Sequence, residues 1–320
     1  MKRVVTIGGG TGTFVVLSGL RRVPDVVLTA IVSSADNGGS TGRLRDAYGI
    51  PPPGDARQAL VALAEEGTLV RELFSYRFTK GDVAGHNLGN LFIAALAERL
   101  GSSTAAIEAA SRMLRTRGRV LSVSDAPTEL IAHLADGSEL AGEHAIDVRT
   151  TGRAPIREIR LASPVAASRA VCEAISDADL IVLGPGDLYT STVAPLLAVG
   201  VREALAASSA TLVYVVNLFT KVGQTDGYGS SRHVTEVEHY AGRSLDRILI
   251  ATDTFPPEAL GRYAAEGEHP VADDLGADPR VVRGSFASVA LVEAVLEDPV
   301  PRALVRHDSA NIANAVGAFL

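Results

Sequence analysis

The chain has 320 residues, 47% of them hydrophobic, and a formal net charge of −7. This acidic balance argues against nucleic acid as the main partner, because binding to a phosphate backbone usually requires a basic face. The single cysteine, Cys172, excludes an intramolecular disulfide and a multi-cysteine zinc site. No uninterrupted apolar run approaches the roughly 18 residues of a membrane span. We therefore expect a cytoplasmic protein with a large core.

The first predicted elements are a strand over 4–7 and a helix that contains Phe14, joined by a glycine-rich loop. Such a junction directs unpaired backbone amides and the positive end of a helix dipole at one place, which suits phosphate. The expected anion ligands are the backbone amides of Gly9, Gly10, Thr11 and Gly12. The alternative is a first turn that binds nothing.

Known nucleotide-binding motifs match this loop only in part. The third glycine of a dinucleotide-binding fingerprint is replaced by Thr13 in one register and by Val15 in the other. No lysine lies between Lys2 and Lys80, which argues against a P-loop. A nicotinamide oxidoreductase stays open as a hypothesis, and it predicts binding of NADH.

A second buried strand is predicted over 26–32, followed by another glycine-rich loop with Asp36 and Asn37. Ligands of open α/β sheets lie at the carboxyl ends of the strands. We therefore expect Asp36 to accept a sugar hydroxyl or to hold a metal ion, and a turn aspartate is the equally weighted alternative. The arginines that follow are candidates to neutralise a phosphate, with surface ion pairs as the alternative: Arg43, Arg45 and Arg57.

Helices are predicted over 56–64, 69–78, 91–100 and 103–114, the first of them capped by Asp55. Polar residues between glycines precede the helix at 91–100, which favours a ligand-facing loop over a core segment. These residues are His86, Asn87 and Asn90.

After a strand over 119–124, the sequence from about 125 to 165 indicates a small β lobe carried on the α/β body. Residues 129–140 alternate around Asp-Gly, a hairpin signal. We read 143–148 and 156–161 as further short antiparallel segments, and His133 and His144 as surface residues. The organisation expected is one domain over 1–320 that includes this lobe.

The parallel pattern resumes with a strand over 179–183 and a third glycine loop, then a helix over 193–206. This loop is a second expected anion site; its candidate residues are Gly186, Asp187, Tyr189, Thr190 and Ser191. Strands over 211–216 and 247–251 follow, with a helix over 234–240, and 281–282 and 287–295 are expected to close the sheet. Residues 311–320 are predicted to form the last helix.

Glycine-rich polar loops thus follow four predicted strands, and all would meet on one edge of a parallel sheet. The predicted fold is α/β, a doubly wound, mostly parallel sheet. We expect the site at that edge.

The loops resemble those of the YvcK/CofD-like family, whose bacterial members are known as gluconeogenesis factors. The matching segments are 8–12, 36–45, 53–57, 85–91, 184–191 and 225–228. The resemblance implies a Rossmann-related fold. On the YvcK side it implies a cytoplasmic protein that binds UDP-sugars such as UDP-N-acetylglucosamine and supports cell shape and growth on gluconeogenic carbon. On the CofD side it implies a magnesium-dependent transferase that moves a phospholactyl group onto a deazaflavin alcohol.

We favour the YvcK side, because the 38–45 and 217–227 loops resemble it. The family commonly has paired aspartates where this chain has Asp36 and Asn37, which weakens a two-carboxylate metal site at Asp36 and with it the transferase. We expect the two glycine loops to hold a diphosphate. Candidates to line the site or to read the base or hexose are Asn87, Asn217, Thr220, Asp226 and His233.

No nucleophile, base and orienter can be grouped from the sequence. If the protein is an enzyme, His86 or Asp187 is the expected general acid or base. The expected partner is a nucleotide sugar, without nucleic acid or a membrane span, and we expect a homo-oligomer, a dimer.

Overall fold

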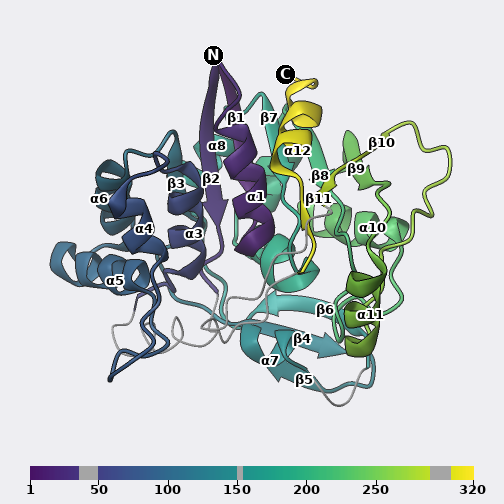
Figure 1. Cartoon of the computed structure of the whole chain (residues 1–320), viewed down its shortest axis with the longest axis horizontal. Coiled ribbons are helices and arrows are strands. Elements are labelled where there is room, and N and C mark those ends of the chain that lie inside the picture. Colours follow the sequence, from purple (N-terminus) through teal and green to yellow (C-terminus); the bar gives the residue numbers. More distant parts are fainter. Residues whose placement is uncertain (36–49, 150–153, 289–303) are drawn as a thin grey trace.

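The computed structural model describes residues 1–35, 50–149, 154–288 and 304–320 (Figure 1). Its centre is a seven-stranded sheet in the order β10-β9-β8-β7-β1-β2-β3, and all neighbouring strands are parallel. The strands are β1 (Lys2–Ile7), β2 (Val26–Val32), β3 (Arg119–Ser122), β7 (Leu180–Leu183), β8 (Thr211–Val215), β9 (Arg247–Ala251) and β10 (Val281–Gly284). The predicted α/β fold with a mostly parallel sheet is confirmed.

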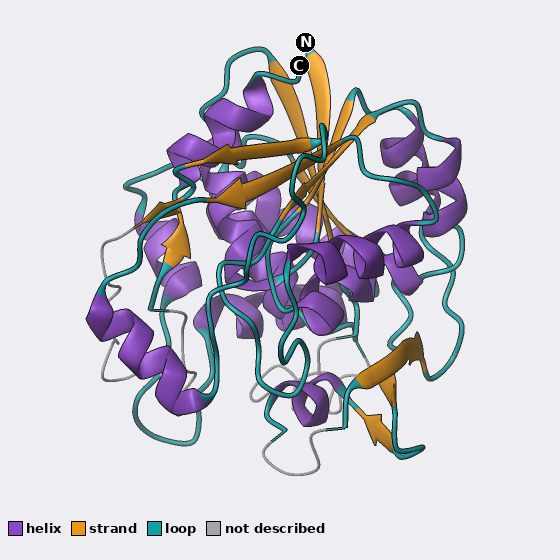
Figure 2. Ribbon diagram, turned by 90° about the vertical axis from the view of Figure 1, so that its right-hand side faces the viewer, coloured by secondary structure: helices purple, strands orange, loops and turns teal. Residues whose placement is uncertain are grey.

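Consecutive residues of each strand point to opposite faces of the sheet, and both faces are covered. Val4 belongs to one core and Val5 to the other, and Leu180 and Ile181 divide in the same way. The core on one face includes residues of α1 (Gly10–Leu20), α3 (Gly54–Leu63), α4 (Leu69–Ser75), α5 (Leu88–Leu100), α6 (Ser103–Leu114) and α12 (Ser309–Gly317). The core on the other face includes residues of α8 (Arg169–Ser176), α9 (Val201–Ala207) and α10 (Ser230–Ala241). Figure 2 shows helices on both sides of the strands.

A separate three-stranded antiparallel sheet lies below the carboxyl ends of the parallel strands (Figure 1). It consists of β4 (Leu130–Leu134), β5 (Glu139–Ala141) and β6 (Ile156–Leu161), in the order β5-β4-β6. The hairpin predicted around Asp136 and Gly137 is confirmed. The prediction of an extended segment at 143–148 is wrong, because the chain turns at Gly142 with φ +93° and then forms α7 (Glu143–Asp147).

Two further predictions near the sheet are wrong. The helix predicted over 193–206 is broken into a π-helical turn, η1 (Leu188–Val193), a 3₁₀ turn, η2 (Ala194–Leu197), and α9. Pro195 has no amide hydrogen to donate, and Gly200 has φ +99° before α9, so one continuous α-helix cannot form. The segment β11 (Ala287–Ser288) pairs antiparallel with β12 (Arg306–His307) instead of closing the sheet. The rest of the predicted 287–295 strand lies outside the described residues.

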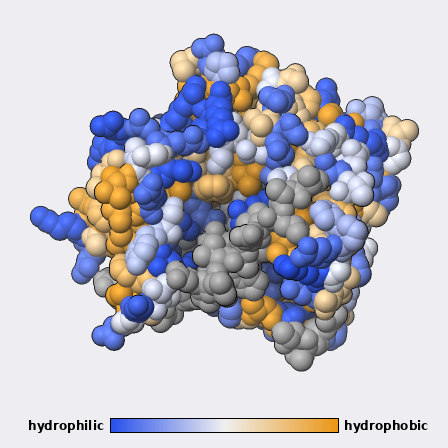
Figure 3. Space-filling model, viewed as in Figure 1, coloured by the Kyte–Doolittle hydropathy of each residue, from blue (hydrophilic) through white to orange (hydrophobic). Residues whose placement is uncertain are grey.

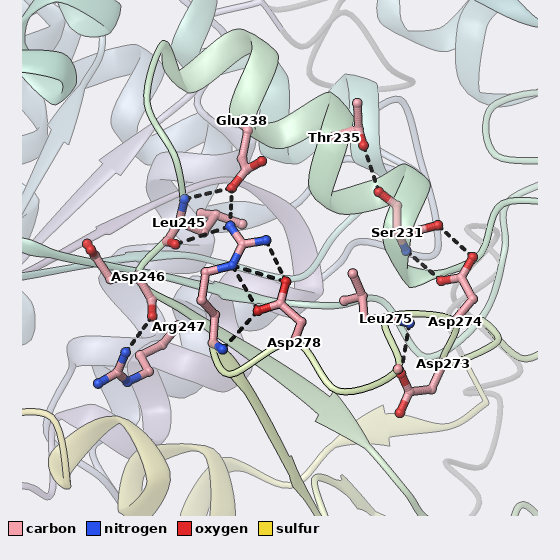
Figure 4. Close-up of polar contacts among 12 residues, drawn as sticks. Ser231, Thr235, Glu238, Leu245, Asp246, Arg247, Asp273, Asp274, Leu275 and Asp278 are labelled. Carbon is pink, nitrogen blue, oxygen red and sulfur yellow. Dashed lines mark hydrogen bonds and ion pairs between the residues drawn. The ribbon is translucent and has the colours of Figure 1, made fainter.

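Hydrogen bonds and ion pairs fix α10 to the lead-in of β10 (Figure 4). The Arg280 guanidinium donates to Glu238 at 2.7 Å and to Asp278 at 2.7 Å. Ser231, in the first turn of α10, donates its amide and hydroxyl to Asp274 at 2.7 and 2.6 Å.

The remaining helix is α11 (Pro257–Glu266). None of the described helices has the length and apolar composition that crossing a bilayer requires.

Candidate functional site

The strand order reverses between β1 and β7. The first strands extend from β1 to β2 and β3, and the chain then returns to the other side of β1 with β7 and continues to β10. Ile7 and Leu183, the last residues of the two strands, are register partners. The loop after β1 leads to α1 on one face, and the loop after β7 leads to η1 on the other. In α/β sheets, ligands bind in the crevice at such a divergence. The space-filling view in Figure 3 shows a hollow near the centre of the side of the molecule that faces the viewer.

The two glycine loops at this point are in backbone contact. A Cβ on Gly12 would lie 1.6 Å from the carbonyl oxygen of Pro185, and a Cβ on Gly186 would lie 3.4 Å from the carbonyl oxygen of Gly9. No side chain larger than hydrogen fits at position 12. Packing of one loop on the other therefore requires glycine at position 12, independently of any ligand.

The first loop is bonded to a carboxylate of the protein. Gly10 donates its amide to Asp55 Oδ1 at 2.9 Å. The prediction that Asp55 caps α3 is wrong: the N-cap is Pro53, and Asp55 lies in the first helical turn, where its side chain reaches across to the loop. Among the described residues, the amides of Thr11 and Gly12 have no acceptor. They are the donors that this helix start offers to a ligand.

The third loop is held by side chains from the chain that follows β8. Asn217 donates from Nδ2 to the carbonyl of Gly186 at 2.5 Å. Gln224 accepts from the amide of Tyr189 at 3.4 Å, while the amides of Ser191 and Thr192 donate to the carbonyl of Asp187. The loop is thus fixed before a ligand arrives, which lowers the entropic cost of binding.

Three carboxylates and one ammonium group meet beside this loop. Lys221 Nζ lies 3.7 Å from Asp147 Oδ1 and 3.9 Å from Glu268 Oε1. Gln224 donates from Nε2 to Asp147 Oδ1 at 3.2 Å. We call Asp147, Asp187, Lys221 and Glu268 the acidic cluster; they come from α7, the start of η1, the loop after β8 and the loop after α11.

Burial and like charge change the protonation of the acidic cluster. Burial, followed by the charge of Asp147, raises the pKa of Asp187 to about 7, although Lys221 opposes this. Burial also raises the pKa of Glu268. Burial lowers the pKa of Lys221, but the three carboxylates outweigh it and the net shift is upward. Asp187 is therefore suited to exchange a proton near neutral pH.

Sequence reasoning found Asp187 but missed the other members of the acidic cluster. Gln224 and Asp147 are 77 positions apart, and no local pattern joins them. One signal was present: lysine occurs only at positions 2, 80 and 221, and arginine supplies the other positive charges. A lysine in a polar loop after a buried strand was therefore unusual in this chain.

Three predicted site residues, Arg57, Asn87 and Asn90, form one network at the start of α5, and His86 directly precedes it. Asn87 is the N-cap, and its Oδ1 accepts from the amide of Asn90 at 3.2 Å. Arg57 Nε donates to Asn90 Oδ1 at 3.0 Å. His86 accepts through its carbonyl from the amide of Phe78 at 2.9 Å. The structure thus brings these residues together and gives Asn87 a capping role; contact with a ligand stays a prediction.

Other predicted site residues make contacts within the protein. The amide of Thr220 donates to the carbonyl of His269, and the hydroxyl of Thr220 accepts from the amide of His269. Asp226 is exposed and accepts from the amide of Gly223 at 2.7 Å, as a turn aspartate does. His233 is fully buried, with Nδ1 2.9 Å from the carbonyl of Gly229, and burial lowers its pKa. Tyr189 is buried with its hydroxyl 3.1 Å from that of Tyr228.

Three predicted site residues, Asp36, Asn37 and Arg43, lie outside the described residues, as does Arg45. Within the described part of the chain, no three Asp, Glu, His or Cys side chains converge as metal ligands. In the acidic cluster the ammonium group of Lys221 lies between carboxylates. The described residues therefore do not form a magnesium site.

Comparisons with known proteins agree with this architecture. The family model described as 2-phospho-L-lactate transferase CofD matches residues 4–286. The chain is 41% identical to a putative gluconeogenesis factor of Thermotoga maritima, over 98% of both chains. It is 38% identical to a gluconeogenesis factor of Listeria monocytogenes, over 99% of this chain and 95% of the relative. A crystal structure of a UPF0052 family member from Bacillus halodurans superposes with a TM-score of 0.89 at 36% identity, over 99% of both chains.

Proposed function

We propose a function for this chain that starts from its family: it belongs to the CofD-like family of gluconeogenesis factors. The proposed function is that of a cytoplasmic nucleotide-sugar-binding protein. The expected ligand is a UDP-sugar such as UDP-N-acetylglucosamine, and the expected role is regulation of carbon metabolism and cell shape. One observation carries the proposal: two glycine loops meet at the point where the strand order reverses. Rossmann-type sheets bind nucleotides at this point.

The chemistry around the crevice is suited to a ligand with both charge and hydroxyl groups. The amides of Thr11 and Gly12, at the start of α1, favour an anion. The carboxylate of Asp55, which reaches the first glycine loop from α3, and that of Asp187, in the third loop, favour hydroxyl donors. A nucleotide sugar supplies both a diphosphate and sugar hydroxyls.

Calorimetric titration with UDP-N-acetylglucosamine, with and without magnesium, tests this function. We expect micromolar binding that needs no metal. Arg43→Ala should weaken it by about 10-fold or more, because a hydrogen bond to a charged group contributes roughly 1.5–3 kcal/mol. Arg112→Ala removes an exposed arginine at the end of α6 and should leave the affinity unchanged. Absence of heat under both conditions would contradict the proposal.

A second candidate function is the phospholactyl transfer that the family model's description names. The observation that favours it is the position of Asp187, which can take the proton of an attacking alcohol while the new P–O bond forms and the bond to the nucleoside monophosphate breaks. With a nucleoside diphosphate donor, magnesium and a deazaflavin alcohol, Asp187→Asn should lower the rate by about 10²–10⁴-fold and retain donor affinity at pH 6.5. Wild-type protein without turnover in this assay would exclude the transferase.

A further inference from the structure

The ammonium group of Lys221 lies between two carboxylates without forming a hydrogen bond to either. Its Nζ lies 3.7 Å from Asp147 Oδ1 and 3.9 Å from Glu268 Oε1, beyond the roughly 3.2 Å limit of an N–H···O bond. In the part of the chain that the structure describes, no acceptor lies within hydrogen-bonding distance of this nitrogen. The Lys221 and Asp147 side chains are 33% and 27% exposed, so a ligand can reach them. We call Asp147, Lys221 and Glu268 the polar triad.

The two gaps of the polar triad have the size and polarity of a hydroxyl group. A hydroxyl oxygen about 2.8 Å from Nζ and from a carboxylate oxygen fits between atoms that are 3.7 or 3.9 Å apart. It accepts a hydrogen bond from the ammonium group and donates one to the carboxylate. Because the ammonium group has three donors, it can serve both gaps at once. A phosphate fits poorly, because it brings only acceptors and two carboxylates repel it.

A single amide group separates the polar triad from the third glycine loop. Gln224 is 2% exposed, its Nε2 donates to Asp147 Oδ1 at 3.2 Å, and its Oε1 accepts from the amide of Tyr189 at 3.4 Å. The Asp147 oxygen therefore lies at most about 9 Å from the Tyr189 nitrogen. The hexose of a nucleotide sugar is bonded directly to a phosphate, so its hydroxyl groups can span this distance from a phosphate at the loop.

A second cation with unsatisfied donors lies against the same turn. Arg149 is 8% exposed, and its Nη2 donates to the carbonyls of Gly223 and Ala154 at 2.6 and 2.9 Å. Its Nε lies 3.1 Å from the position of a Cβ built on Gly223. The buried Nε and Nη1 have no acceptor among the described residues, whereas buried polar groups are normally hydrogen-bonded. Arg149 and Lys221 together leave donors unsatisfied at the turn 221–225, which favours a ligand rich in oxygen atoms.

We propose that the polar triad is the sugar subsite of the nucleotide-sugar site, where Lys221, Asp147 and Glu268 bind two neighbouring hydroxyl groups of the hexose. The inference rests on the proposed function, because it assumes a diphosphate at the glycine loops. It also fixes the direction of the ligand. The charged diphosphate lies at the glycine-loop amides, and the neutral sugar lies at the polar triad, beside α7.

Calorimetric titration with UDP-N-acetylglucosamine and with UDP, which lacks the sugar, tests the subsite. Lys221→Met and Glu268→Gln should each weaken binding of the nucleotide sugar by about tenfold and leave the affinity for UDP within about twofold of wild type. A purely electrostatic effect on the phosphates would have opposite signs in the two variants, because one removes a positive charge and the other a negative charge. Lys2→Met is the matched control: it removes a lysine that pairs with Asp179, outside the polar triad, and should change neither affinity.

The outcomes separate the inference from the function on which it rests. Wild type that binds neither compound contradicts the proposed function. If wild type binds, the inference is overturned by unchanged affinities in both variants, by equal weakening of both compounds, or by effects of opposite sign in Lys221→Met and Glu268→Gln. Should Lys221→Met not fold by circular dichroism, Asp147→Asn takes its place, since it keeps the side-chain shape and turns an acceptor oxygen into a donor group. It should weaken binding of the nucleotide sugar and spare that of UDP.

Discussion

Replacement of Gly12 by alanine is expected to lower the free energy of unfolding by about 3 kcal/mol or more, although alanine is the better helix former. Gly12 lies in the first turn of α1, and the new Cβ would stand 1.6 Å from the carbonyl oxygen of Pro185. That oxygen belongs to the backbone of the third glycine loop, so relief of the clash requires the two loops to separate. Urea denaturation followed by circular dichroism measures the change.

A matched control comes from another helical glycine. Gly261 lies inside α11, and no heavy atom comes within 4 Å of a Cβ built there. Gly261→Ala should therefore stabilise the protein by up to about 1 kcal/mol, the ordinary helix propensity difference. Glycine-to-alanine substitution is thus expected to lower the free energy of unfolding at position 12 and to raise it at position 261.

The Gly12 variant also separates two explanations of the glycine loop. If Gly12 served only to let a ligand approach, alanine would weaken binding and leave stability unchanged. If loop packing requires it, stability falls even without ligand. An unfolding midpoint equal to that of wild type would show that the contact between Gly12 and Pro185 is not part of the folded state.

The sheet was predictable because each strand is a short, nearly continuous apolar run that both faces of a parallel sheet bury. The strand predicted over 26–32 and the helix predicted over 103–114 have the same bounds in the structure. The wrong predictions of secondary structure concern short segments. Residues 143–147 form α7 because one glycine turns the chain before them, and five residues are too few for periodicity to decide between helix and strand.

The candidate site was predictable only where it follows a strand. Asp187 comes directly after the glycine loop of β7, so sheet topology alone places it at the carboxyl edge. Asp147, the last residue of α7, and Glu268, in the loop after α11, reach the same place from other parts of the chain. Their contacts with Lys221 depend on how these elements pack in three dimensions, which no local sequence pattern encodes.

Asn87, Asn217 and Asp226 were predicted to contact a ligand, and the structure gives each of them a second role. Asn87 caps a helix, Asp226 closes a turn, and Asn217 ties β8 to the third loop. Loops of this kind need such bonds because their backbone amides are not paired in a ladder. Sequence alone cannot tell a side chain that holds a loop from one that holds a ligand.

Removal of the positive charge from the acidic cluster is expected to have the other large effect. Lys221→Met keeps most of the side-chain volume but leaves Asp147, Asp187 and Glu268 without their counter-charge. Removal of one partner of a buried ion pair typically costs 3–5 kcal/mol, and since Lys221 is one-third exposed we expect about 1–3 kcal/mol at pH 8. Lys2→Met breaks an exposed pair with Asp179 and should cost less than about 1 kcal/mol.

The pH dependence distinguishes this electrostatic cost from a loss of packing. The pKa of Asp187 is raised to about 7 in the folded protein, so its contribution to stability is most favourable below the unfolded pKa and is lost as pH rises toward 7. Lys221→Met raises this pKa further, so its cost should be smaller at pH 5, where Asp187 is protonated, than at pH 8. Adding Asp187→Asn should recover part of the loss at pH 8. An equal cost at both pH values would mean that Lys221 contributes packing and not charge, and that the carboxylates of the acidic cluster are hydrated instead of paired.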